Sequence, residues 1–370
     1  MDTPQFTTLD GETLLKTLQG FCVEEGASDI HVSPQKKDVR LEWRIHGVLR
    51  PLASITHAAY ADFLRRVKFE SRLKLNLTNI PQDGQYTFAA TAKGVTRSVN
   101  IRVATLPSRF GEALTLRLLD PERGILPLEK LGFPADIRAT LAQIVELPNG
   151  LVLVTGPTGS GKTTTLYALL STIIGKERNI ITLEDPVEYE LPGIIQSEID
   201  TDHDFTFASG LRSILRHDPD VILVGEIRDL ETAQTAVNAA LTGHLVLSTL
   251  HTNSAIEAIP RFLSMGVSPY TFAPALRAVL AQRLVRTLTP ACRESGTCDP
   301  GAHESYDGQI ALPELLMVSP AISQQILSFE QAPAIETQAR KEGFRTMKDW
   351  GEQFIAEKRT SREEVARVTS

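Results

Sequence analysis

The chain has 370 residues, of which 42% are hydrophobic and 22% charged, and its formal net charge is −7. This composition excludes a disordered, fibrous or membrane-spanning protein, and the acidic balance argues against a general nucleic-acid-binding protein, which would be basic. Because the N-terminus has no targeting pattern and no run of about 18 apolar residues occurs, we expect a cytoplasmic protein with at most peripheral membrane contact.

The first domain is predicted to be α+β and to span residues 1–120. Between Ser28 and Leu49 apolar residues alternate with polar ones, which is typical of half-buried strands. A helix is expected around residues 60–75, and strand-like runs return after the PQDG at residues 81–84. A linker rich in proline and glycine is predicted at residues 121–134.

The second domain is predicted at residues 135–300. Four short apolar runs are typical of buried parallel strands, at residues 151–155, 179–184, 221–227 and 245–250. Helical segments separate these runs, and in one of them Asp229 is suited to cap the start and Gly243 the end. The alternation predicts a doubly wound α/β core. Residues 301–370 are predicted to be a mostly helical region without a catalytic motif.

The segment GPTGSGKT matches the phosphate-loop pattern and lies between a predicted strand and a predicted helix. Its glycines let backbone N–H groups close around phosphate oxygens, Lys162 reaches the β and γ phosphates, and the Thr163 hydroxyl binds Mg²⁺. A glycine turn without a nucleotide is the alternative. The predicted nucleotide-binding residues are Gly156, Pro157, Thr158, Gly159, Ser160, Gly161, Lys162, Thr163 and Thr164.

Two glutamates at strand ends are candidates for the chemistry of hydrolysis, Glu184 and Glu226. In open α/β sheets the carboxyl ends of the strands line the ligand crevice, so both side chains are expected to face the nucleotide. There, carboxylates order Mg²⁺ and the attacking water. We assign Mg²⁺ to Thr163 and Glu226, through the nucleotide or water. A solvated carboxylate without a catalytic role is the alternative for both glutamates.

Two histidines flank the apolar run at residues 245–250. His251 follows the run and is expected at the same sheet edge as Glu226, whereas His244 precedes it and lies roughly 20 Å away at the rise of a strand. This separation argues against one metal ion bound by both. His251 is therefore the better candidate for sensing the γ-phosphate.

Four segments in chain order resemble the Walker A, Asp box, Walker B and His box regions of type II secretion and type IV pilus assembly ATPases. They are GPTGSGKTTTLYALL, ITLEDPVEYELPGIIQSEI, LRSILRHDPDVILVGEIRDLETAQTAVNAALTGHLVLSTLHTNSA and AQRLVRTL. SDIHVSP and RVATLPSRFGEALTLRLL are similar to the N-terminal domain of this family, and EGFRTMKDW to its C-terminal helices. The resemblance covers nearly the whole chain from Gly26 onward.

The resemblance implies a RecA-like ATPase core with a PAS-like N-terminal domain. It also implies a homohexamer at an inner-membrane platform protein, where ATP hydrolysis drives pilus or pseudopilus assembly. In this family Glu184 would activate water, Glu226 would be the Walker B acid, and His251 and His244 would couple the nucleotide state to domain geometry. The segment EDPVEY looks more like the assembly branch than the retraction branch. Type IV pilus, type II secretion and competence pilus all stay open.

Two arginines of the N-terminal domain, Arg102 and Arg117, match family arginines that reach the nucleotide in the closed ring. A desolvated guanidinium near a γ-phosphate would stabilise the transferring charge, as an arginine finger does. Ordinary surface arginines on exposed strand faces are the alternative.

Three features depart from the family pattern. His46 stands where an aspartate usually precedes the glycine of a turn. The secretion branch often has two C-x-x-C pairs that bind zinc, whereas Cys292, Cys298 and His303 offer at most three ligands, so zinc is not expected. Long members carry a further platform-binding domain before the one with which this chain starts, so we expect a different or smaller docking surface. With Cys22, the three cysteines indicate a reducing compartment rather than a disulfide framework.

Two other functions are alternatives to the motor. A nucleic-acid translocase of RecA-like fold requires a basic channel with aromatic side chains, which 6% aromatic residues and a negative net charge do not favour, so no direct nucleic-acid partner is expected. A regulator that binds a nucleotide without turnover would not need the combination of Lys162, Glu184 and Glu226.

Overall fold

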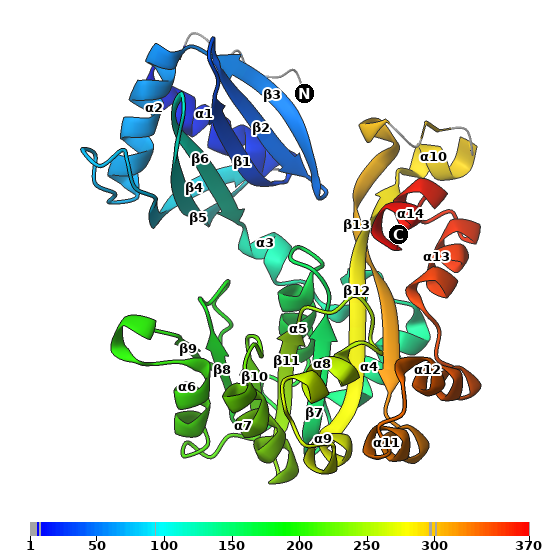
Figure 1. Ribbon diagram of the computed structural model, residues 1–370. Coiled ribbons are helices and arrows are strands. Elements are labelled where there is room, and N and C mark those ends of the chain that lie inside the picture. Colours follow the sequence, from blue (N-terminus) through cyan, green and yellow to red (C-terminus); the bar gives the residue numbers. More distant parts are fainter. Residues whose placement is uncertain (1–5, 7–8, 93, 296–297, 300–301, 370) are drawn as a thin grey trace. The chain divides into compact units, whose positions relative to one another are not determined.

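The computed structural model describes residues 6, 9–92, 94–295, 298–299 and 302–369. The chain divides into two compact units, Met1–Gly124 and Ile125–Ser370, each with its own hydrophobic core (Figure 1). The predicted linker contains the short helix α3 (Pro121–Gly124) and the 3-10 helix η2 (Leu128–Leu131). Because Leu128 and Leu131 are buried in the second core, this part of the linker folds with the second unit.

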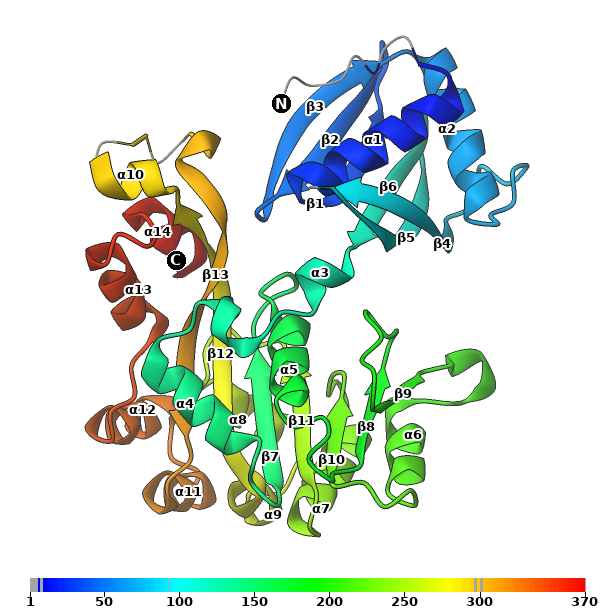
Figure 2. The same ribbon diagram turned by 180° about the vertical axis from the view of Figure 1, so that it is seen from behind.

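The first unit is a six-stranded sheet in the order β3-β2-β1-β6-β5-β4, with every neighbouring pair antiparallel. Its strands are β1 (Ala27–Pro34), β2 (Val39–Ile45), β3 (Val48–Ile55), β4 (Gln82–Ala92), β5 (Val95–Ser108) and β6 (Gly111–Leu119). Helices α1 (Gly11–Glu25) and α2 (His57–Glu70) pack against each other (Figure 2). The predicted α+β character of this region agrees with these elements.

Helix α1 and the turn between β2 and β3 add to what the sequence predicted for this unit. Helix α1 was not predicted; it begins at Gly11 and is capped by Asp10, whose carboxylate accepts hydrogen bonds from the N–H groups of Glu12 and Thr13. His46 and Gly47 form the turn between β2 and β3, with φ angles of 48° and 77°. Histidine tolerates this left-handed conformation better than most non-glycine residues.

The second unit is a seven-stranded sheet in the order β13-β12-β7-β11-β10-β8-β9. Its strands are β7 (Gly150–Thr155), β8 (Ile180–Glu184), β9 (Ile195–Glu198), β10 (Val221–Val224), β11 (Leu245–Leu250), β12 (Leu276–Leu288) and β13 (Tyr306–Met317). Neighbouring strands are parallel except for the pair β12 and β13. The predicted α/β core is confirmed, with all four predicted strands present.

Helices cover both faces of the second sheet. The elements between strands are α4 (Ala135–Ile144), α5 (Lys162–Ser171), α6 (Phe207–Ile214), α7 (Leu230–Leu241), α8 (Ala258–Ser264), α9 (Pro269–Ala275) and α10 (Pro290–Ser295). Helices α4 and α5 lie on one face, and α7 and α9 on the other (Figures 1 and 2). The C-terminal helices are α11 (Pro320–Leu327), α12 (Ala332–Lys341), α13 (Met347–Ala356) and α14 (Arg362–Thr369).

Two expectations about the C-terminal part were wrong. The predicted helical region begins with β13, which pairs along β12, so the boundary set at residue 300 separates two strands of one sheet. Because residues 311–316 of β13 are all buried, the polar Glu314 included, its sequence lacks the alternation that identifies a half-buried strand. Cys292 and Cys298 form a disulfide, although the low cysteine count favoured free thiols. The side chain of His303, the third zinc ligand considered, lies outside the described residues.

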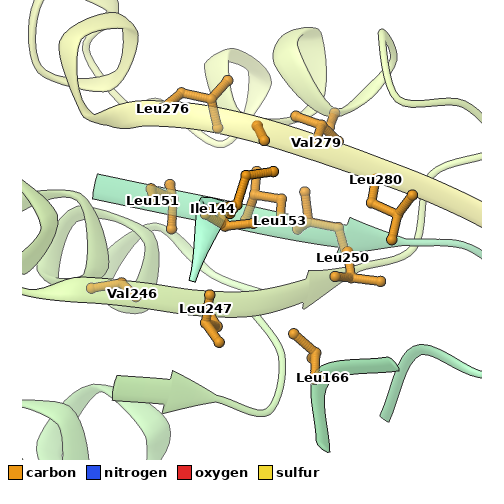
Figure 3. Close-up of a cluster of buried hydrophobic side chains, with 14 of the residues drawn as sticks. Ile144, Leu151, Leu153, Leu166, Val246, Leu247, Leu250, Leu276, Val279 and Leu280 are labelled. Carbon is orange, nitrogen blue, oxygen red and sulfur yellow. The ribbon is translucent and has the colours of Figure 1, made fainter. Parts of the chain in front are cut away.

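Buried hydrophobic side chains pack around the central strands of the second sheet (Figure 3). All residues of β7 and β11 are buried, as expected for parallel strands covered on both faces. Leu153, Leu247 and Leu280 are fully buried on three adjacent strands, and burying one such side chain stabilises the fold by about 1.5–3 kcal/mol. The loops at the carboxyl ends of these strands therefore start from rigid positions.

Candidate nucleotide-binding site

The phosphate loop joins the end of β7 to the start of α5. Three of its residues have positive φ angles, Gly156 at 149°, Gly159 at 78° and Gly161 at 85°, a region that glycine favours. A Cβ on Gly156 would lie 2.6 Å from the Gln282 carbonyl oxygen and from the Ser160 Oγ. Only glycine therefore fits there, and the start of the helix is the place at which an anion can approach backbone N–H groups.

Lys162 is the first residue of α5 and points back over the loop. Its Nζ donates hydrogen bonds to the carbonyl oxygens of Gly156, at 2.8 Å, and Pro157, at 3.1 Å. Burial lowers the pKa of Lys162 to about 8, with Glu226 acting in the opposite direction and Arg283 adding to the decrease. A bound phosphate would supply the negative charge that this partly desolvated ammonium lacks.

Gln282 supports the phosphate loop from β12, a residue that the sequence reasoning missed. Its side chain is fully buried. The amide N–H donates to the Ser160 carbonyl oxygen at 2.7 Å, and the amide oxygen accepts from the Thr165 hydroxyl at 2.9 Å. The one signal in the sequence was its place in the AQRLVRTL segment, where a glutamine interrupts an apolar run.

The Walker B candidate, Glu226, is fixed by backbone hydrogen bonds on both sides. The N–H of Gly225 donates to the Leu183 carbonyl at 2.8 Å, and the N–H of Ile227 donates to the Thr249 carbonyl at 3.1 Å. These bonds connect the end of β10 to its neighbours β8 and β11. The Glu226 side chain is 15% exposed, so its carboxylate has limited access to solvent.

His251 lies beside Glu226, as the strand order predicted. Its Nε2 is 3.5 Å from Glu226 Oε2, and Arg228 Nη2 is 2.5 Å from Glu226 Oε1. The next residue, Thr252, donates its N–H to the hydroxyl of Thr155, which directly precedes the phosphate loop, at 2.8 Å. The segment that carries His251 is thus tied to the strand that ends at the phosphate loop.

His244 lies at the opposite end of β11. Its carbonyl oxygen accepts from the N–H of Gly150 at 3.1 Å, and Gly150 begins β7. Since Leu250 pairs with Thr155 at the other end of the same two strands, His244 is separated from the phosphate loop by their full length. The structure therefore brings His251, and not His244, to the candidate site.

Glu184 ends β8 at the same sheet edge as Glu226, but this residue is only 4% exposed. The hydroxyl of Tyr167 donates to its Oε2, and the hydroxyl of Thr182 donates to its Oε1 at 2.6 Å. The amide of Gln196 also donates to Oε1, at 3.2 Å. Every partner is a neutral donor, which suits an ionised carboxylate.

Arg102 and Arg117 lie in the first unit, directly opposite each other on β5 and β6. Arg117 Nε donates to the buried Asp29 at 3.0 Å, and the Arg117 side chain is 50% exposed. Asp29 on β1 is in turn the register partner of Arg117. The two arginines therefore form one cross-strand row, in which a buried carboxylate fixes the direction of Arg117.

The loop and the strand-end carboxylates fit ATP with Mg²⁺. The Ser160 hydroxyl is buried without a hydrogen-bond partner among the described residues, at the centre of a loop built around glycines. The residues that would hold Mg²⁺ are Thr163 and Glu226. Mg²⁺ normally needs only one or two protein groups beside the phosphates. Across the described residues, no group of three His, Cys, Asp or Glu side chains is arranged for a metal ion.

None of the helices in the described part of the chain has the length and hydrophobicity that crossing a membrane requires.

Comparison with known protein sequences identifies relatives in secretion systems. Residues 12–367 match the family described as Type II/IV secretion system protein. Type II secretion system protein HxcR of Pseudomonas aeruginosa is 42% identical over 382 residues, covering 100% of this chain and 81% of that protein. Type II secretion system ATPase E of Vibrio cholerae is 41% identical, covering 96% of this chain and 75% of that protein.

Solved structures agree with the sequence comparison. The crystal structure of the pilus retraction motor PilT with bound ADP is similar with a TM-score of 0.65 and 29% identity, and the match covers 96% of each chain. The X-ray structure of the Legionella pneumophila ATPase DotB has a TM-score of 0.75 at 21% identity, covering 99% of this chain and 97% of that one. The second likeness supports the fold alone.

Proposed function

The chain belongs to the Type II/IV secretion system protein family and is a motor ATPase for secretion or pilus assembly, and we propose that it works as a homohexamer of the assembly branch. In this proposal ATP hydrolysis drives the assembly of a pilus or pseudopilus at a platform protein of the inner membrane. The chain would lie at the cytoplasmic face of that membrane as a peripheral protein.

The observation that carries the proposed site is the convergence of three groups at one edge of the second sheet. The phosphate loop follows β7, Glu226 follows β10, and Glu184 ends β8. The carboxyl ends of parallel strands form the ligand crevice in this class of fold. This arrangement supports three separate roles: the phosphate loop binds the nucleotide, Glu226 helps to order Mg²⁺, and Glu184 activates the attacking water.

Each residue has a role that follows from its chemistry. Lys162 neutralises phosphate charge, and the backbone N–H groups of the loop bind phosphate oxygens. Glu184 accepts a proton from the attacking water. Mg²⁺, when bound at Thr163 and Glu226, would neutralise charge on the phosphates. His251, 3.5 Å from Glu226, would respond to the charge at this carboxylate and so sense the γ-phosphate.

The arginine row of the first unit completes the proposal. Arg102 and Arg117 would reach a nucleotide only in an assembled ring, where a guanidinium in a dry site stabilises the transferring phosphoryl group. Asp29 supports this role because it fixes the direction of the Arg117 guanidinium. His244 would act at a distance from the nucleotide, at the opposite sheet edge.

The test is the ATPase activity of the purified chain together with its mass in solution. We expect Mg²⁺-dependent hydrolysis, loss of ATP binding in Lys162→Ala, and a ring of six chains with a non-hydrolysable ATP analogue, measured by light scattering. A monomer that hydrolyses ATP at full rate would contradict the hexamer and the arginine roles. Hydrolysis that is unaffected in Lys162→Ala would contradict the assignment of the phosphate loop.

A further inference from the structure

The carboxylate of Glu184 is held on both oxygens by three neutral donors. Thr182 and Gln196 donate to Oε1, at 2.6 Å and 3.2 Å, and Tyr167 donates to Oε2. A carboxylate has about four acceptor sites. The three donors therefore leave one acceptor site, on the oxygen that Tyr167 contacts.

Tyr167 differs from the other two donors because it comes from the helix of the phosphate loop. It lies on α5, four residues after Thr163 and five after Lys162. Residues four apart lie on the same side of a helix. The hydroxyl on Glu184 and the groups assigned to phosphate and Mg²⁺ therefore belong to one rigid element.

The Tyr167 ring is held in place independently of its hydroxyl. It is fully buried, and it makes an edge-on contact with Tyr189, with 6.5 Å between ring centroids. Burial raises the pKa of Tyr167, and the charge of Glu184 adds to this effect. The hydroxyl is therefore a neutral donor throughout the range in which enzymes work.

We propose that Tyr167 is a positioning residue for ATP hydrolysis, whose hydroxyl orients Glu184 so that one acceptor site stays available to the attacking water. Because Tyr167 shares α5 with Lys162, it also sets the distance between the water-activating carboxylate and the phosphate site. The inference rests on the proposed role of Glu184. The expected signature is a loss of turnover without a loss of ATP binding.

The experiment compares kcat and KM for ATP in Tyr167→Phe, which keeps the ring and removes the donor. A hydrogen bond to a charged group is lost, so we expect kcat to fall about 10-fold or more, with KM within about twofold because the phosphate loop is unchanged. The matched control is Tyr270→Phe on α9, whose side chain is exposed and which precedes β12, at the sheet edge opposite the phosphate loop. It should behave as wild type.

A second variant and a double-mutant cycle separate positioning from a general structural effect. Thr182→Val removes one of the two donors on the other oxygen and should also lower kcat with KM retained. In the Glu184→Gln background, single-turnover rates should be the same with Tyr167 and with Phe at this position, because the residue that Tyr167 orients no longer acts as a base.

The outcomes distinguish the inference from the proposed function. Full turnover in Glu184→Gln would overturn the role of Glu184 and the inference with it. An inactive Glu184→Gln beside a wild-type kcat in Tyr167→Phe would overturn the positioning role alone. An equal loss from Tyr167→Phe in both backgrounds, or a large rise in KM, would show a structural role and would also overturn the positioning role.

Discussion

Glu226 and His251 lie at the carboxyl ends of the adjacent parallel strands β10 and β11, with 3.5 Å between Glu226 Oε2 and His251 Nε2. The two residues are not neighbours in the chain, because the helix α7 lies between them. The contact arises because the two strands end at the same edge of the sheet. A change of charge at Glu226 is therefore felt directly at the segment that follows β11.

Glu226→Gln is expected to retain ATP binding and to lose turnover about 100-fold. The phosphate loop that binds ATP remains intact, whereas the amide is a poorer group for ordering Mg²⁺ and water. Binding is measured by calorimetry and kcat by phosphate release. Asp218→Asn is the control, since this exposed carboxylate precedes β10 at the opposite edge. Equal rates in Glu226→Gln and the control would remove the Walker B assignment.

Gln282→Leu is expected to weaken ATP binding about 10-fold. The leucine leaves the Ser160 carbonyl and the Thr165 hydroxyl without the partners that hold the loop, and each unsatisfied buried group costs about 1–3 kcal/mol of stability. We expect KM for ATP to rise and the melting temperature to fall. Gln143→Leu on the exposed side of α4 is the control. An unchanged KM would show that the loop keeps its shape without Gln282.

Arg117→Ala is expected to lower kcat while ATP binding that depends on Lys162 is retained. The guanidinium would act only on the charge that develops during hydrolysis. Arg40→Ala, an exposed arginine on β2, serves as the control in the same unit. Both variants are compared at equal oligomeric state. Full activity of Arg117→Ala in a verified hexamer would exclude the arginine-finger role.

ATP binding is expected to take up protons at alkaline pH. Because burial lowers the pKa of free Lys162 to about 8, most of this side chain is neutral at pH 8.5 and regains its proton when phosphate binds. The sign is therefore uptake, of about 0.8 proton per ATP at pH 8.5 and close to zero at pH 6.5. Calorimetry in buffers of different ionisation enthalpy measures it. In Lys162→Arg the uptake should disappear, and its absence in the wild type would contradict a lowered pKa.

Glu364→Gln is expected to destabilise the attachment of α14 to β12. Glu364 is 1% exposed and accepts hydrogen bonds from the side chain and the backbone N–H of Arg286, at 2.5 Å and 3.1 Å. Removing one partner of a buried ion pair costs about 3 kcal/mol. The free energy of unfolding is measured with urea, with the exposed Glu363→Gln as the control.

The same pair gives a pH dependence with a definite sign. Burial raises the pKa of Glu364, but hydrogen bonds from Arg367 and Arg286 outweigh it and lower the pKa from 4.5 to about 2. The stabilisation is therefore present above pH 4.5 and is lost as the pH falls toward 2. The difference in unfolding free energy between wild type and Glu364→Gln should shrink over that range. A constant difference would contradict the linkage.

Local patterns predicted much of the second unit. The continuous apolar runs identified β7, β8, β10 and β11, and the glycine pattern identified the phosphate loop, because both depend on neighbouring residues. The pattern failed for β13, whose buried residues do not alternate with exposed ones, and for α1, which packs against α2 and β4. The helix predicted around residues 60–75 is α2, at His57–Glu70. Its ends differ from the prediction because they are set by the capping residues Thr56 and Ser71.

The sequence by itself determined the type of site and the edge at which it lies. A glycine loop after a buried strand binds phosphate, and residues that follow parallel strands meet at the same edge whatever the details of packing. For this reason His251 could be separated from His244 before any side chain was placed. Family resemblance then supplied the motor function.

Only the tertiary structure decided which side chains support the site. Gln282 comes from a strand that lies 120 residues beyond Lys162 in the chain, and Tyr167 reaches Glu184 across the space between a helix and a sheet. Such contacts are set by packing distances and by the need to satisfy buried polar groups. No local pattern encodes them, because they depend on which elements the fold brings together.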